Sequence, residues 1–294
     1  MHEDQLEVGA DDVVRLVTDL LPDRAGSEVR ALETSATTSH VFRVGSDLLA
    51  RFPLRKTDAK QARAALEAEH RAMDEFARHC PVPAPRPVAI GSPSRHFPMP
   101  WSVQTWVPGG IANPHELAAS SGFASDLADL LMALRSVDTR GRTFTGQGRG
   151  GSLSDHDDWV GLCLARSHGL LPVRELATRW ARWRTLERVQ QDVMSHGDLI
   201  PANLLTDGTR LTGVLDTGGF SPADPALDLV AAWHLLDGPR RALVREALGC
   251  SELEWERGSA WAFAQAIGLV WYYQDTNPPI AELGRSTLAR LLEP

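Results

Sequence analysis

The sequence has few cysteines, little lysine and no long apolar run. Its three cysteines, Cys80, Cys163 and Cys250, are odd in number and far apart, which argues against a disulfide framework and against a two-cysteine metal site. The longest uncharged apolar runs, such as residues 262–273, fall short of the roughly 20 residues that a transmembrane helix needs. The first residues, Met1–Asp4, lack the basic and apolar regions of a secretory signal. We therefore expect a cytoplasmic protein with no membrane partner.

Basic residues are outnumbered as well. The chain holds 30 Lys and Arg against 38 Asp and Glu, a formal net charge of −8, which argues against a nucleic-acid partner because phosphate backbones are bound by basic surfaces. After Pro108 the count is 17 basic against 23 acidic residues, so this part carries most of the negative charge. That distribution suits a cationic substrate and equally suits a solubilising surface. The sequence carries no signal for an oligomeric state.

The hydrophobic pattern predicts an α+β protein with two lobes. With 294 residues and 43% hydrophobic content, the chain can bury a large core. The spacing of apolar residues predicts a helix over 11–21, strands over 29–32, 41–44 and 47–52, a helix over 59–79, and extended segments over 88–90 and 101–107. Beyond Pro108 it predicts helices over 117–137, 158–169, 173–193, 255–273 and 280–292, with a mobile loop or crossover over 141–151. We therefore expect a small β-rich N-terminal lobe over 1–107 and a larger, mainly helical C-terminal lobe over 108–294.

The most informative stretch runs from Ser195 to Leu205 and is followed by an apolar run that ends at Asp216. Asp198 and Asn203 are separated by four residues on what reads as one tight loop, and Asp216 follows a short hairpin. Phosphoryl transfer needs a carboxylate near the attacking hydroxyl and oxygen ligands for magnesium, and these residue types supply both. Each residue alone would also suit a solvated turn, because Asp and Asn are common turn formers. The linked set favours the catalytic interpretation.

This pattern, His-x-Asp-x-x-x-x-Asn, a spacer and an apolar run that ends in Asp, resembles the catalytic and metal-binding loops of the aminoglycoside phosphotransferase family. The continuation from Asp224 to Leu229 resembles the next signature of that family. The resemblance implies a protein-kinase-like fold and an enzyme that moves the γ-phosphoryl group of ATP or GTP, with Mg²⁺, onto a hydroxyl of a small molecule. It implies that Asp198 is the catalytic base and that Asn203 and Asp216 are the magnesium ligands.

Three nearby residues receive structural roles. His196 is expected to organise the loop, buried or hydrogen-bonded within it, and Asp228 to bind backbone amides near the catalytic loop. Asp224, followed by Pro225, is interpreted as a helix start.

The N-terminal lobe departs from the kinase pattern in two ways. The segment expected to cover the nucleotide phosphates, Glu33–His40, contains no glycine. Neither of the two lysines, Lys56 and Lys60, lies in an apolar run, whereas Arg51 does. Arginine supplies the same charge with a fork that suits phosphate, and an arginine here matches many members of the family that the sequence resembles.

The partner of Arg51 should be a carboxylate on the following helix. We favour Glu69, one turn before the apolar residue Met73, and keep Glu67 open. A surface arginine at a strand end remains the plain alternative. By resemblance, Gln104 to Val107, including Trp106, would be the hinge whose backbone groups meet the nucleotide base.

An aminoglycoside-type antibiotic is the leading substrate class, on the resemblance and the acidic C-terminal part, and its phosphorylation would confer antibiotic resistance. Proteins of this family shape also act on macrolides, choline, homoserine and sugars, so another small-molecule hydroxyl is the alternative within the enzyme class. A catalytically weak nucleotide-binding protein is the alternative outside it, favoured by the glycine-free segment and opposed by the intact set of Asp198, Asn203 and Asp216.

Overall fold

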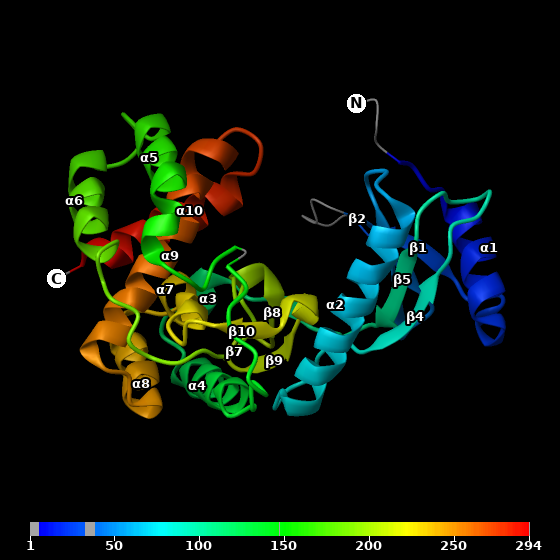
Figure 1. Cartoon of the computed structure of the whole chain (residues 1–294), viewed down its shortest axis with the longest axis horizontal. Helices are drawn as coiled ribbons and strands as arrows, with labels where there is room; N and C mark the ends of the chain where they lie inside the picture. Colours follow the sequence, from blue (N-terminus) through cyan, green and yellow to red (C-terminus); the bar gives the residue numbers. More distant parts are fainter. Residues whose placement is uncertain (1–5, 33–38, 147, 294) are drawn as a thin grey trace. The chain divides into compact units, whose positions relative to one another are not determined.

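The chain folds into two compact units in the computed structural model, which describes residues 6–32, 39–146 and 148–293. The first unit takes in the described residues up to Arg78, Pro83–Pro108 and Asp216–Gly219, and the second takes in the rest. Figure 1 shows that the first unit is rich in strands and the second in helices. This agrees with the predicted α+β class.

The first unit is built on a five-stranded antiparallel sheet. Its strands are β1 (Val29–Leu32), β2 (Ser39–Val44), β3 (Leu48–Pro53), β4 (Pro87–Gly91) and β5 (Trp101–Thr105), in the order β1-β2-β3-β5-β4. In the view of Figure 1 the strands lie between helix α1 (Ala10–Leu20) and helix α2 (Ala59–His79), and a 3-10 turn, η1 (Pro22–Arg24), follows α1. Helix α2 has the bounds predicted from the sequence.

Strand β3 shows how this sheet presents Arg51. Leu48, Ala50 and Phe52 are buried, whereas the residues between them are only half-buried. Because successive side chains of a strand point to opposite faces, Arg51 faces away from the core that Phe52 enters. Phe52 stacks on Trp101 with ring centroids 4.7 Å apart, which fixes the middle of the sheet.

One glycine is required by this packing. A Cβ atom on Gly91 would lie 2.1 Å from Cε2 of Trp101, so the indole fits only because position 91 has no side chain. The edge strand β4 is thereby brought close to β5.

The second unit is mainly helical. Its helices are α3 (Pro114–Leu117), α4 (Ser121–Arg135), α5 (Asp157–Arg166), α6 (Val173–Trp183), α7 (Val230–Leu235), α8 (Gly238–Leu248), α9 (Glu252–Tyr273) and α10 (Pro278–Leu292). Short 3-10 turns lie at η2 (Leu153–His156), η3 (Pro201–Asn203) and η5 (Leu227–Leu229). Helix α9 is buried along most of its length and packs against α5, α7 and α10. Over the described ranges, no helix combines the length and the apolar character that a bilayer crossing demands.

Two small sheets frame the predicted catalytic loop. One contains β6 (Gly110–Ile111), β8 (Leu204–Thr206) and β9 (Leu211–Val214), and the other pairs β7 (Val193–Ser195) with β10 (Ser221–Ala223). The loop runs from β7 to β8, and the β8-β9 hairpin leads to Asp216 and the 3-10 turn η4 (Thr217–Gly219). The hairpin predicted before Asp216 is therefore present.

Two predicted helices are shorter than the apolar pattern indicated. The helix expected over 117–137 is divided into α3 and α4, because the Ser120 Oγ accepts a hydrogen bond from the Phe123 N–H at 3.1 Å and starts a new helix. The helix expected over 173–193 ends at Trp183. Beyond it the chain is irregular up to β7 and makes tertiary contacts: the Leu186 carbonyl accepts from Arg257, and Asp192 accepts from the Phe144 N–H.

Helix α7 follows the helix start predicted at Asp224, although its bounds were not predicted, and helix α8 was not predicted at all. Every residue of α7 is buried, so it has no polar face and no helical period to detect. Helix α8 does carry end signals, since Asp237 accepts from the Arg240 N–H at 3.0 Å and Gly249 closes the helix with φ of 61°.

Candidate active site

The loop between β7 and β8 holds Asp198 and Asn203 in a fixed relation. The Asn203 Nδ2 donates a hydrogen bond to the backbone carbonyl of Asp198 at 2.9 Å. The Asn203 N–H donates to the Ile200 carbonyl at 2.9 Å, which closes the η3 turn. The first bond uses the donor end of the Asn203 amide, so its carbonyl oxygen is the end that can face a cation. The Asp198 carboxylate, 41% exposed, can meet a ligand from solvent.

His196 ties this loop to the end of β9. Its Nδ1 accepts a hydrogen bond from the Asp198 N–H at 3.3 Å, and its Nε2 lies 2.8 Å from the Leu215 carbonyl oxygen. A carbonyl can only accept, so Nε2 carries the proton and the ring is the neutral tautomer. The ring is buried, as expected for a residue that organises the loop.

Asp228 clamps the start of the loop. One carboxylate oxygen accepts from the His196 N–H at 2.7 Å and the other accepts from the Gly197 N–H at 2.9 Å. Asp228 is buried in η5, so these charge-assisted bonds are shielded from water. The predicted role of Asp228 is confirmed. Gly197 itself has φ of 82°, a conformation that favours glycine.

Asp224 has a larger role than the predicted helix start. Its Oδ1 does accept from the Ala226 N–H at 3.0 Å, as a residue before a turn should. Its Oδ2 accepts from the Arg257 Nε and from the Trp261 Nε1, each at 2.9 Å. Asp224 is therefore the centre of a buried polar network. No residue near it in the sequence indicates its partners Arg257 and Trp261 on α9.

Asp216 follows Leu215, whose N–H donates to the Asn203 carbonyl at 2.8 Å. It has φ of 54°, a left-handed conformation that non-glycine residues rarely adopt and that is frequent at functional sites. Within the first unit, the Asp216 Oδ1 lies 3.7 Å from the Arg51 Nη1. The structure thus brings together Arg51 and Asp216, two of the site residues predicted from the sequence.

Glu69 belongs to the same cluster. Burial raises the pKa of the Glu69 carboxyl, the Arg51 charge lowers it, and the Asp216 charge raises it. Burial also lowers the pKa of the neighbouring His70, and the Arg51 guanidinium lowers it further. Glu67, the other candidate partner, accepts instead from the Arg63 Nε at 3.0 Å. Of the two candidates, Glu69 is therefore the one whose carboxyl pKa responds to the charges of Arg51 and Asp216.

Gln104 and Trp106 lie at the end of β5. Gln104 is buried and pairs with Leu49 of β3 in the sheet. The Trp106 N–H donates to the Asp47 carbonyl at 2.7 Å, and the Arg43 guanidinium lies 4.2 Å from the centre of its ring. Positions 33–38 of the glycine-free segment Glu33–His40 lie outside the described residues. The last two residues of that segment, Ser39 and His40, begin β2.

Sequence reasoning missed Arg149. Its Nη2 forms an ion pair with the Asp198 Oδ1, so a cation contacts the predicted catalytic base within the second unit. Arg149 lies between Gly148 and Gly150 in a segment with no helical or strand period. No local pattern marks it, because its partner is 49 residues away.

The available oxygen donors fit magnesium better than a metal held by protein alone. Within the ranges that the structure describes, no group of three or more His, Cys, Asp or Glu side chains is arranged to hold a metal ion. Asn203 and Asp216 offer one neutral and one charged oxygen donor. Mg²⁺ is usually held by one or two carboxylates together with substrate phosphates and water. Asn203 in the second unit and Asp216 in the first are therefore each of a residue type that suits Mg²⁺ bound together with phosphate oxygens.

Solved structures with the same fold cover nearly the whole chain. One is a GDP complex of aminoglycoside 2'-phosphotransferase-IIIa, with 18% identity, a TM-score of 0.68, and coverage of 96% of this chain and 98% of the other. A second is the apoenzyme of macrolide 2'-phosphotransferase MphH from Brachybacterium faecium, with 21% identity, a TM-score of 0.61, and coverage of 97% and 98%. A third is ADP-bound aminoglycoside phosphotransferase APH(2'')-Ib, with 16% identity, a TM-score of 0.58, and coverage of 97% and 100%. These similarities confirm the predicted bilobal fold.

Comparison with curated proteins gave no match. A sequence model of the phosphotransferase enzyme family (APH), however, matches residues 28–263. This match takes in all the motifs from Ser195 to Leu229 on which the resemblance rests, together with Arg51 and Glu69. The chain therefore belongs to the phosphotransferase enzyme family, and it is an enzyme that transfers phosphoryl groups.

Proposed function

We propose that this phosphotransferase moves the γ-phosphoryl group of ATP or GTP to a hydroxyl of a small molecule, with aminoglycoside-type antibiotics as the leading substrate class. The observation that carries the proposal is the geometry of the loop between β7 and β8. Asp198 and Asn203 are locked together by a 2.9 Å hydrogen bond, and Asp228 clamps the same loop through two backbone N–H groups. A rigid pair of this kind supplies the positioning that phosphoryl transfer requires.

Asp198 is proposed as the base. Its carboxylate accepts a hydrogen bond from the acceptor hydroxyl and takes the proton as the new O–P bond forms. The bond between the γ-phosphorus and the β,γ-bridging oxygen breaks, and the nucleoside diphosphate leaves with that electron pair. Asn203 and Asp216 would hold the magnesium ion that, when bound, neutralises charge on the phosphate oxygens.

Arg51 is proposed to bind the nucleotide phosphates. It lies on the face of the sheet opposite the core, half-buried, and carries a permanent charge on a planar fork that matches phosphate oxygens. Glu69 would orient the guanidinium through its nearby charge. The nucleotide would thus be bound chiefly by the proposed lobe 1–107 and the acceptor by the proposed lobe 108–294.

The base of the nucleotide is proposed to meet the backbone at Gln104–Val107. The Trp106 N–H already donates to Asp47, so other backbone groups of this segment would contact the base. Backbone contacts alone allow either adenine or guanine.

The acceptor class rests on charge and on the relatives. The chain after Pro108 contains 23 acidic and 17 basic residues, and this excess of negative charge suits a cationic acceptor such as an aminoglycoside. The structurally similar macrolide 2'-phosphotransferases make a macrolide hydroxyl the second candidate. Phosphorylation of either class would give resistance to the antibiotic. Consumption of a nucleoside triphosphate and the three unpaired cysteines favour a cytoplasmic location.

The test is turnover by the full-length protein. Thermal unfolding is first measured with ATP and with GTP, each with and without magnesium, to identify the donor. Phosphate transfer is then measured over aminoglycosides, macrolides, choline, homoserine and simple sugars. We expect magnesium-dependent stabilisation and transfer to an aminoglycoside. Transfer only to a macrolide or a metabolite would reassign the substrate, and nucleotide binding without transfer to any acceptor or to water would contradict the proposed activity.

A further inference from the structure

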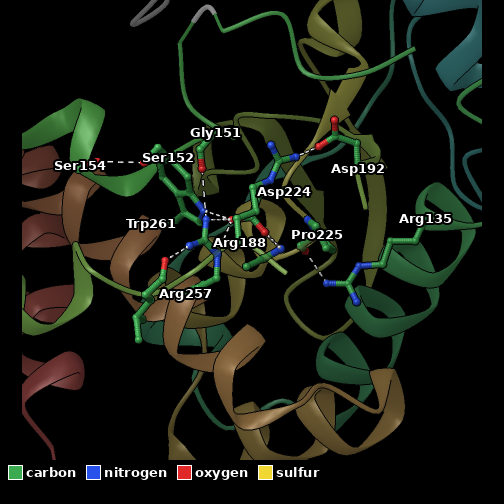
Figure 2. A network of polar contacts seen from close by, with 12 residues as sticks. Arg135, Gly151, Ser152, Ser154, Arg188, Asp192, Asp224, Pro225, Arg257 and Trp261 are labelled. Atoms are coloured by element: carbon green, nitrogen blue, oxygen red, sulfur yellow. Dashed lines mark hydrogen bonds and ion pairs between the residues drawn. The ribbon is translucent and has the colours of Figure 1, made fainter. Parts of the chain in front are cut away.

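The segment 141–151, predicted to be a mobile loop or a crossover, contacts the rest of the second unit near both of its ends. Near its start, the Phe144 N–H donates to the Asp192 Oδ2 at 2.8 Å. Asp192 in turn forms an ion pair with Arg188 (Figure 2), whose guanidinium lies 6.0 Å from the centre of the Phe144 ring. The first anchor therefore fixes the backbone with a charge pair and a ring contact.

The second anchor is a buried ion pair. Asp224 and Arg257 are 2% and 3% exposed, and Figure 2 shows the two side chains joined in one network with Trp261. The Asp224 N–H donates to the Gly150 carbonyl at 2.9 Å, and the Arg257 Nη2 donates to the Gly151 carbonyl at 3.2 Å. A hydrogen-bonded pair shielded from water holds its neighbours rigidly, because breaking it would leave a buried charge without a partner.

The two glycines allow the segment to sit against this anchor. A Cβ atom on Gly150 would lie 2.7 Å from the Ala223 Cβ, and Gly150 has φ of 117°. A Cβ atom on Gly151 would lie 2.5 Å from a ring carbon of Phe144. Close packing of both positions fixes the backbone directly after Arg149.

From this backbone position the Arg149 side chain reaches Asp198, and its Nη2 forms an ion pair with the Asp198 Oδ1. The loop 198–203 contains no basic residue of its own. The buried pair of Asp224 and Arg257 thus fixes the backbone next to Arg149, which supplies a positive charge to Asp198, the proposed base. The Arg149 side chain is 35% exposed and the Asp198 side chain 41%, so a ligand from solvent can reach both.

We propose that Arg149 is a positioning residue for phosphoryl transfer, which engages one carboxylate oxygen of Asp198 so that the other oxygen faces the acceptor hydroxyl. This inference rests on the proposed role of Asp198 and deepens it. An ionised carboxylate that is held at one oxygen has one orientation instead of several, and misorientation of a reacting group lowers the rate without weakening nucleotide binding. The Asp224–Arg257 pair is the support that keeps Arg149 in place.

The experiment compares Arg149→Ala, Arg149→Lys, Asp198→Asn and the double variant Arg149→Ala/Asp198→Asn in the full-length protein. Turnover is measured with the best acceptor of the panel and with water, as nucleotide hydrolysis. We expect Arg149→Ala to lower kcat by about tenfold or more while the nucleotide KM changes less than about twofold, because only orientation is lost. Arg149→Lys should recover part of kcat, since it keeps the charge and loses the fork. The double variant should be no slower than Asp198→Asn alone.

The matched control is Arg140→Ala, an exposed arginine in the same part of the chain, which should leave kcat and KM unchanged. Thermal unfolding of each variant checks folding. Wild-type or increased kcat in a folded Arg149→Ala variant overturns the inference, and so does a loss confined to nucleotide KM or one that adds fully to that of Asp198→Asn. If Asp198→Asn itself keeps wild-type turnover, the role of Asp198 as the base fails instead, so the two failures are distinguishable.

Discussion

Arg51 Nη1 lies 3.7 Å from Asp216 Oδ1, so the arginine proposed for the nucleotide phosphates is paired with the carboxylate proposed for magnesium. Each is the natural partner of a different part of a magnesium nucleotide: a guanidinium binds phosphate oxygens and a carboxylate binds the cation. The two opposite charges attract each other at this distance. A magnesium nucleotide offers each of them a new partner of opposite charge, which costs little because the ion pair is partly solvated.

Arg51→Ala should therefore raise the nucleotide KM and lower kcat, each by about tenfold, since a charge-assisted bond to phosphate is worth roughly 1.5–3 kcal/mol. Arg51→Lys should recover only part of the loss, because the point charge remains and the fork is gone. Steady-state kinetics with varied nucleotide checks both variants, and Arg30→Ala provides a control at an exposed arginine of the same sheet. Wild-type nucleotide kinetics in Arg51→Ala would remove the phosphate role from this residue.

Glu69→Ala should be milder than Arg51→Ala, because Glu69 acts on the guanidinium only through charge. The double variant should cost less than the sum of the single losses if the two residues act as one unit. Fully additive losses would argue against the pair. Glu67→Ala is the matched control and should leave the nucleotide kinetics unchanged, because Glu67 accepts a hydrogen bond from Arg63.

Magnesium dependence should separate Asp216 from Asn203. Asp216→Ala should raise the magnesium concentration needed for half-maximal turnover by more than Asn203→Ala does, because a carboxylate neutralises the cation whereas an amide only coordinates it. Titration of magnesium at saturating nucleotide gives both values. An unchanged requirement in Asp216→Ala would contradict its role as a metal ligand. In Asn203→Ala the loop also loses the bond to the Asp198 carbonyl, so its thermal unfolding is measured alongside.

Asp198→Asn should leave folding and nucleotide affinity nearly unchanged and lower turnover by at least about a hundredfold, the scale of losing a positioned general base. The Asp198 side chain is 41% exposed, so the substitution removes no buried charge. Turnover within a few fold of wild type would show that Asp198 is not the base.

Sequence reasoning worked where the signal is local. Helix α2 was predicted with its observed bounds because 21 residues without Pro or Gly carry one helical period. Helix α6 was predicted too long, because the irregular segment that follows it makes contacts through Leu186 and Asp192 with distant residues, which are invisible in the sequence. In the site, the motif identified the loop residues Asp198 and Asn203. The residues that support that loop from afar, Arg149 and Arg257, have no local pattern and could not be found without the fold.

His234 in α7 makes the stability of the fold depend on pH. This ring is completely buried: its Nδ1 lies 2.9 Å from the Thr287 Oγ1 and its Nε2 lies 3.2 Å from the Gln265 Oε1. A carboxamide oxygen only accepts, so Nε2 donates to it, Nδ1 accepts from the hydroxyl, and the neutral ring is satisfied. Burial lowers the pKa of His234 to about 4, an effect partly opposed by the hydrogen bond with Gln265.

The consequence for stability has a definite sign. Below the ordinary histidine pKa of about 6.5 the unfolded chain binds a proton at this position, whereas the folded protein does so only near pH 4. The free energy of unfolding should therefore fall as pH drops from about 6.5 to about 4, by about 3 kcal/mol from this group alone, and then level off. Urea unfolding between pH 4 and pH 7.5 measures the slope. His234→Asn should be less stable at pH 7 and flatter over this range, whereas the exposed His168→Gln should keep the wild-type slope; an unchanged slope in His234→Asn would show that other groups dominate the acid sensitivity.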